Sequence, residues 1–255
     1  MPESSEALMI DLARRLAAVP DAALRVAYVG STLSSLHPTH ATDVLLVAQA
    51  RADTRDPLAT SLWLASATSL LAAERDALRR TIAAHAEARD AFGLVAALVD
   101  LPDERLSMDE EDEQRVPDYG SDRPLTLGER KSLARKPRRA MLGRIAQDPH
   151  PDVIRQLLGN PALTEADVIA MVARRPVPRA TLLEVAASAR WTERPRVRLA
   201  LVRNPYTPTH VAVSYVRGLA LQELREIVDA SELPSVVRSV ARTLLGEPIA
   251  GPTLH

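Results

Sequence analysis

Apolar residues recur at intervals of three and four along the first hundred positions of this chain. The segment 3–19 shows the pattern with Leu8, Ile10, Leu12, Leu16 and Val19. This spacing gathers apolar side chains on one face of an α-helix, whereas a strand would alternate apolar and polar positions. Prolines separate the successive periodic segments, and Asp56 before Pro57 is a typical helix start. The pattern predicts an all-α N-terminal domain over residues 1–101.

Residues 102–124 interrupt the helical pattern with an acidic, proline-bounded sequence. The run DEEDE occupies positions 109–113. Like charges at this density repel one another, and the segment offers little apolar surface to bury. We therefore expect an acidic linker over 102–124, a second helical region over 125–246 and a tail over 247–255.

The second helical region repeats a phrase built around Asn-Pro. LLGNPALTEADVIAMV (157–172) is echoed by LVRNPYTPTHVAVSYV (201–216), which places Asn160 and Asn204 44 residues apart. Periods of this length are typical of stacked helical units. Because proline disfavours the helical conformation in the preceding residue, we expect each asparagine to end a helix in the left-handed conformation. We expect Thr164 and Thr207 to cap the helices that follow.

The segment DPHPDVIRQLL (148–158), an Asp-Pro turn before a leucine-rich helix, resembles a HEAT-type repeat. The corner RNPYTP (203–208) is similar to the leucine-rich repeat variant, a bacterial α-solenoid. The resemblance covers about residues 126–245 and implies a HEAT-like α-solenoid behind the helical N-terminal domain. The chain lacks the cysteine cluster of the variant family, so the resemblance implies no iron–sulfur role.

Composition narrows the possible functions. The chain has no cysteine, which excludes disulfides, Cys-ligated zinc and thiol catalysis. No apolar run approaches the roughly 20 residues that a membrane helix needs, and the acidic N-terminus is unlike a signal peptide. No catalytic or phosphate-binding motif stands out. His37, His40 and Asp43 lack the further ligand and second shell that a metal site needs, and they are interpreted as a loop in which Thr39 or Thr42 caps the next helix. We expect a soluble cytoplasmic protein without enzymatic activity, cofactor, metal or membrane contact.

The net charge of −1 hides a strong asymmetry along the chain. Residues 1–122 carry 11 Lys/Arg and 21 Asp/Glu, a net −10, whereas residues 123–210 carry 17 and 7, a net +10. This asymmetry indicates an acidic partner for the middle segment. The partner is either another molecule or the acidic run 109–113 of the same chain, which would then mask the basic residues.

The densest basic stretch is GERKSLARKPRRAMLGR (128–144). We expect a binding surface made by its cations, by arginines of a later corner and by a tryptophan among arginines: Arg130, Lys131, Arg135, Lys136, Arg138, Arg139, Arg144, Arg174, Arg175, Arg179 and Trp191. The alternative for the cations is that they lie on a solvated helix face or near helix C-termini, where positive charge interacts favourably with the helix dipole. The alternative for the tryptophan is a buried position in the seam between repeats. Arg155, Arg198 and Arg238 sit at equivalent repeat positions and are expected to support neighbouring repeats.

These features predict a scaffold or adaptor that presents a basic helical-repeat surface to an acidic protein segment. The alternative is sequence-independent nucleic-acid binding through residues 130–144, whose enzymatic extreme would be a relative of the HEAT-like DNA glycosylases. Aromatic residues make up only 3% of the chain, which counts against the glycosylase because that function needs an aromatic-lined groove.

Overall fold

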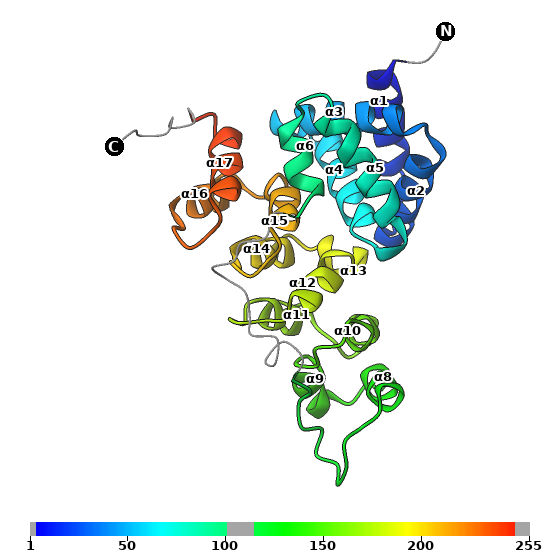
Figure 1. The fold of residues 1–255 in the computed structure, drawn as a ribbon, viewed down its shortest axis with the longest axis vertical. Helices are drawn as coiled ribbons and strands as arrows, with labels where there is room; N and C mark the ends of the chain where they lie inside the picture. Colours follow the sequence, from blue (N-terminus) through cyan, green and yellow to red (C-terminus); the bar gives the residue numbers. More distant parts are fainter. Residues whose placement is uncertain (1–3, 101–114, 248–255) are drawn as a thin grey trace.

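The computed structural model describes residues 4–100 and 115–247, and every regular element in these ranges is a helix (Figure 1). The N-terminal half contains α1 (Ser5–Ala17), α2 (Ala22–Ser35), α3 (Pro38–Asp53), α4 (Pro57–Leu70), the short 3-10 helix η1 (Ala73–Arg75), α5 (Asp76–Glu87) and α6 (Phe92–Leu98). The C-terminal half contains α8 (Leu127–Arg135), α9 (Arg139–Ile145), α10 (Pro151–Leu158), α11 (Glu165–Val172), α12 (Arg179–Ala186), α13 (Ala189–Thr192), α14 (Pro195–Arg203), α15 (Thr209–Val216), α16 (Leu221–Asp229) and α17 (Ser235–Leu244). The prediction of an all-α fold is confirmed. Among the described helices, none combines the length and the apolar character that a membrane crossing requires.

The N-terminal helices pack around α3 and α4, which contact each other as well as α1, α2 and α5. The expected cap is present at α4, where the Asp56 carboxylate accepts hydrogen bonds from the Leu58 and Ala59 amides at 2.9 and 3.2 Å. At the start of α3 the cap is the ring of His37, which accepts from the Thr39 amide. His37 therefore serves as a helix cap here.

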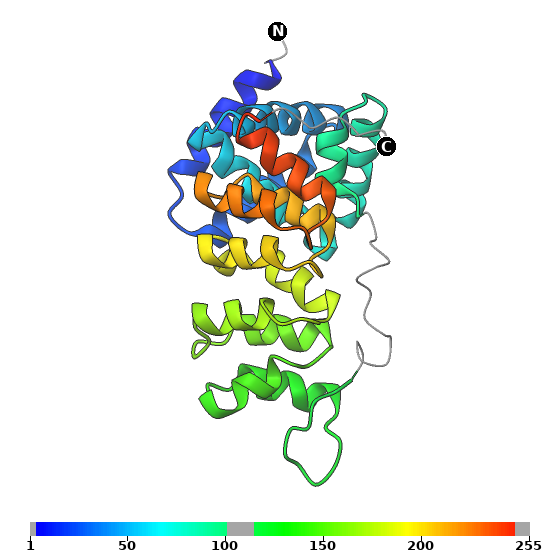
Figure 2. The same cartoon turned by 90° about the vertical axis from the view of Figure 1, so that its left-hand side faces the viewer.

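The C-terminal helices form a stack of short antiparallel pairs, layered from α8 and α9 at one end to α16 and α17 at the other (Figure 2). Helix α10 lies between α8 and α12, and α11 packs against α14. The two copies of the Asn-Pro phrase correspond to the pairs α10–α11 and α14–α15. Because each helix is only eight or nine residues long, it depends on its neighbours for burial, and α15 is buried along its whole length. This is an all-α helical-repeat fold.

The N-terminal helices join the stack through α13 and α15, which α2, α4 and α6 contact. Trp63 of α4 is 2% exposed and donates its indole N–H to the Ser214 carbonyl of α15 at 2.8 Å. Beside it, the hydroxyls of Thr68 and Tyr215 lie 2.9 Å apart, and burial raises the pKa of Tyr215 to about 12. The two halves therefore share one continuous hydrophobic core.

The expected acidic linker falls largely outside the described residues, since 102–114, including the run 109–113, are not among them. Its described part, 115–124, and the two residues that follow it before α8 contain no regular helix, and this 115–126 segment lies beside α9, at the end of the stack far from α6 (Figure 2). It is anchored by Tyr119, whose hydroxyl donates to the buried Asp148 at 2.5 Å. Of the expected tail, residues 248–255 also lie outside the described ranges.

Candidate binding surface

The corner that carries the basic stretch is held in place by Asn160. This side chain is 1% exposed, and its amide nitrogen donates to the carbonyls of Ala134 and Lys136 at 2.7 and 2.9 Å. Its oxygen accepts from the Ala162 amide at 2.9 Å. The last carbonyls of a helix have no partner within the helix, so the asparagine caps the C-terminus of α8 from the neighbouring repeat.

Asn204 does the same one repeat later. Its amide donates to the carbonyls of Val172 and Arg174 at 2.5 and 2.9 Å, and its oxygen accepts from the Tyr206 amide at 2.9 Å. The repeated asparagine therefore links neighbouring repeats by hydrogen bonds: Asn204 caps the C-terminus of α11, as Asn160 caps that of α8.

The expectation that each repeated asparagine ends a helix in the left-handed conformation is wrong. Neither asparagine is in the left-handed conformation, which among described non-glycine residues occurs only at Arg55 and Asp90. Thr164 caps α11 as expected, in a reciprocal box with Asp167. Thr207 does not cap α15, because its hydroxyl donates to the Leu201 carbonyl of α14 at 2.6 Å.

Arg130, the first cation of the basic stretch, is part of the structural framework. Its side chain is 11% exposed and donates to both oxygens of the fully buried Asp148 at 2.8 and 2.7 Å. Asp148 also accepts from Tyr119 and from the His150 amide. Burial, followed by the hydrogen bond to Asp148, raises the pKa of Tyr119. A cation held in this way cannot contact a partner without breaking the network.

Two further cations of the stretch also bind carboxylates of the next repeat. Lys131 contacts Asp152 at 2.9 Å, and Arg139 contacts Asp167 with both guanidinium nitrogens, one of them at 2.8 Å. The hydrogen bond from Arg139 holds the pKa of Asp167 at about 2. Arg139 keeps 60% of its side chain exposed, so it contributes charge to the surface while it is ion-paired.

Three adjacent cations remain exposed at the turn between α8 and α9: Arg135, Lys136 and Arg138. None of them forms an ion pair with a carboxylate within the described ranges. We call these three residues the basic corner. Arg135 lies in the last turn of α8, where a cation also favours the helix dipole. The pair α8–α9 forms one end of the stack (Figure 1), so the basic corner lies at that end.

Arg144 belongs to a different surface. It lies in the last turn of α9, six residues and about 9 Å along the helix axis from Arg138 at about 1.5 Å per residue. Its guanidinium lies close to Gly120 in the 115–126 segment, within 2.7 Å of where a β-carbon at that glycine would be. The sequence thus groups residues that the fold separates.

The three arginines of the later corner that were expected to add to the binding surface form contacts between helices. Arg174 donates to the Ala146 carbonyl at 3.0 Å, and burial lowers its pKa. Arg175 donates to the Arg203 carbonyl at 2.7 Å, and Arg179 is ion-paired with Asp100 at the end of the N-terminal half. These three side chains join layers of the structure and do not form a continuous strip with the basic corner.

Trp191 is placed in the seam between repeats. It is 1% exposed, donates its indole N–H to the Leu158 carbonyl at 2.8 Å and lies beneath the guanidiniums of Arg190 and Arg194. The expectation that it stacks on a base or anchors a partner does not fit this burial. The surrounding arginines, which suggested an exposed site in the sequence, cover its ring.

The arginines at equivalent repeat positions support the fold through different contacts. Arg155 forms a two-pronged ion pair with Glu184 of α12, at 3.0 and 2.6 Å. Arg198 donates to the Thr192 and Glu193 carbonyls, and Arg238 to the Leu233 carbonyl. Arg155 therefore links neighbouring helices through a carboxylate, whereas the other two brace the loops that precede their own helices.

Comparison with known proteins does not assign the chain to a family. No family model, no curated protein and no solved structure matches the chain. The functional interpretation therefore depends on the geometry of the chain itself.

Proposed function

We propose that this chain is a cytoplasmic, non-enzymatic binding protein with a HEAT-like stack, and that its basic corner binds an acidic segment of another protein. The observation that carries this proposal is that Arg135, Lys136 and Arg138 are exposed, adjacent and without a carboxylate partner among the described residues. Many other arginines of the stack have such partners, as the ion pairs of Arg139, Arg155 and Arg194 illustrate.

Charges of this kind act mainly on encounter and orientation. Three cations within four positions of the chain generate a local positive potential that reaches about 8–10 Å at physiological salt. An acidic peptide would be steered to the corner and held by charge-assisted hydrogen bonds, while the neighbouring Arg139 adds to the field. The proposal therefore predicts moderate affinity with a marked dependence on salt.

The chemistry around the corner favours an acidic protein over a nucleic acid. Residues 127–145 contain no aromatic side chain, and Trp191 is buried, so neither of these parts of the described structure offers a base-stacking group beside the cations. Nucleic acid is the competing outcome, and it would be bound through phosphates alone.

Fluorescence anisotropy with a labelled Asp/Glu-rich peptide and a labelled DNA duplex tests the proposal. We expect the peptide to bind more tightly than the duplex, and the reversal Arg135→Glu/Lys136→Glu/Arg138→Glu to weaken peptide binding about tenfold or more, or about 1.4 kcal/mol. The control reverses three exposed arginines elsewhere, Arg14→Glu/Arg196→Glu/Arg225→Glu, which changes the net charge equally. An equal loss of peptide affinity in both variants would show that only the net charge matters, and it would refute the proposal that the basic corner is a specific binding site.

A further inference from the structure

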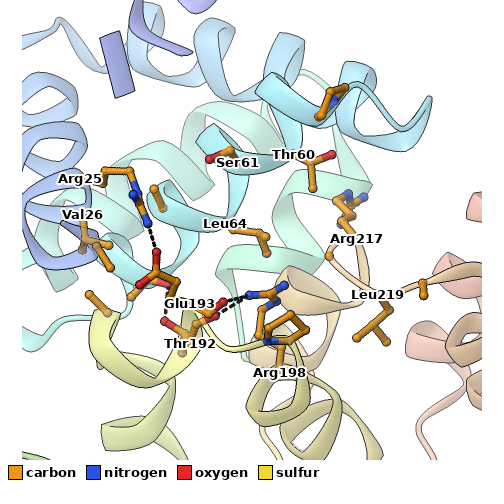
Figure 3. Close-up of a pocket in the computed structure, with 18 of the residues that line it drawn as sticks. Arg25, Val26, Thr60, Ser61, Leu64, Thr192, Glu193, Arg198, Arg217 and Leu219 are labelled. Atoms are coloured by element: carbon orange, nitrogen blue, oxygen red, sulfur yellow. Dashed lines mark hydrogen bonds and ion pairs between the residues drawn. The ribbon is translucent and has the colours of Figure 1, made fainter. Parts of the chain in front are cut away.

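A second site lies where the N-terminal helices meet the stack. A pocket of about 620 Å³ opens between α2 and α4 on one side and α13, α14 and the turn before α16 on the other (Figure 3). Its size is within the range of about 300–1,000 Å³ that small-molecule sites occupy. Nothing in the basic corner contributes to it.

Four arginines line this pocket, and two of them are neutralised by carboxylates. Arg25 of α2 forms an ion pair with Glu193, which Figure 3 shows across the pocket wall. Arg217 is 3% exposed, donates to Asp53 at 2.7 Å and lies over the ring of Trp63. These two pairs join the N-terminal half to the stack and leave no excess charge.

The third arginine, Arg198, is buried without a carboxylate partner of its own. It is 8% exposed, its hydrogen bonds go to the carbonyls of Thr192 and Glu193 at 2.7 and 2.9 Å, and its Nε–H has no partner in the described structure. Burial lowers the pKa of Arg198, which reflects the cost of its charge in this setting. A buried cation whose hydrogen bonds go only to neutral groups is destabilising, because its charge has lost water without gaining a counter-charge.

The fourth arginine, Arg55, occupies an unusual backbone position. Its φ is +67°, a left-handed conformation at the end of α3 that favours glycine and is strained for other residues. Its Nη1 donates to the Leu219 carbonyl at 2.7 Å, whereas its buried Nε and Nη2 have no partner in the described ranges. Glycine would adopt this backbone conformation without strain but would supply no guanidinium to the pocket.

The charges and the lining together define the chemical class of a ligand. Apart from the two ion pairs, the carboxylate that remains among the described lining residues is that of Glu223, which accepts from the Ala220 amide at 2.7 Å. One positive charge is therefore uncompensated. The remaining wall includes the apolar side chains of Val26 and Leu64, and Leu64 lies at the middle of the view in Figure 3.

We infer that this pocket binds a small organic carboxylate, whose single negative charge balances Arg55 and Arg198 and whose apolar body packs against Val26, Leu64 and Leu219. A planar guanidinium matches a carboxylate geometrically, and a monoanion compensates the one excess charge, which a doubly charged phosphate monoester would overcompensate. Since the pocket lies between the two halves of the chain, an occupied site also stabilises their junction.

Isothermal titration calorimetry on the full chain tests this site with octanoate and phenylacetate as carboxylates, octanamide as the neutral analogue and octyl phosphate as the dianion. We expect at least one carboxylate to bind, at least tenfold tighter than octanamide and tighter than octyl phosphate. Absence of binding by both carboxylates, or equal binding of octanoate and octanamide, would overturn the inference. Tighter binding of octyl phosphate would overturn the charge argument.

Two variants separate binding from folding. Arg55→Gly removes the guanidinium and relieves the left-handed backbone, so it should weaken the carboxylate at least tenfold without lowering the melting temperature. Arg89→Gln removes a surface arginine that pairs with Asp43 outside the pocket, and should leave binding unchanged. If Arg55→Gly folds and binds the carboxylate as well as the parent chain, the site does not depend on this charge and the inference fails.

Discussion

Replacing Asn160 by alanine should cost more stability than its small change in volume suggests. The substitution removes three hydrogen bonds at once, two donated to the carbonyls of Ala134 and Lys136 and one accepted from the Ala162 amide. Each neutral hydrogen bond contributes about 1 kcal/mol net. Because the side chain is 1% exposed, water cannot readily replace them, and we expect a loss of about 3 kcal/mol.

Urea unfolding followed by circular dichroism measures this loss. For an m-value of about 3 kcal/mol/M, the midpoint should fall by about 1 M with little change in slope. Asn160→Asp keeps the acceptor for Ala162 but turns a carboxylate toward two carbonyls, so it should lose more than the alanine variant at neutral pH. Gln222→Ala, an exposed change on α16, serves as the control.

The result that would refute this reasoning is a loss below about 1 kcal/mol for Asn160→Ala with normal folding of the control. Asn160 would then serve only as a turn residue, and the association of neighbouring repeats would have to be attributed to apolar packing. Asn160 and Asn204 are the only asparagines in the chain, so both copies of the contact can be tested without interference from others.

Two further predictions concern the ion pairs of the first repeats. Asp148→Asn leaves Arg130, 11% exposed, without its carboxylate, and should lower stability by about 3 kcal/mol in thermal unfolding; a loss below about 1 kcal/mol would show that the pair is dispensable. Because Arg139 holds the pKa of Asp167 at about 2, below its usual 3.8, the stability from this pair is full above about pH 4 and is lost as the pH falls toward 2. Asp167→Asn should reduce the pH dependence of the urea midpoint in that range, and an unchanged profile would contradict the assignment.

The repeat could be recognised from the sequence, but the function of its asparagine could not. The spacing of Asn160 and Asn204 predicts stacked helices, and a local reading of Asn-Pro then suggests a helix end. The carbonyls that the Asn160 amide caps lie 24 and 26 residues earlier, on another helix. A contact at that separation depends on how repeats pack, which local propensity does not contain.

Contacts between residues far apart in the sequence also explain why the candidate binding surface was only partly predicted. The basic stretch is visible in the sequence, yet Arg130, Lys131 and Arg139 find carboxylates 18, 21 and 28 residues away, in the following repeat. The pocket arginines at 55 and 198 come from distant segments and share no motif. The positive φ of Arg55 is a structural feature that the residues around it did not predict.

The most direct test of the proposed function is to locate the bound peptide. An Asp/Glu-rich peptide with a photoreactive benzophenone group, crosslinked to the full chain and mapped by mass spectrometry, should label the α8–α9 turn around Arg135, Lys136 and Arg138. The labelling should decline as salt is raised. Crosslinks concentrated on α14 to α17, or spread evenly over the surface, would contradict the claim that the basic corner is the docking site.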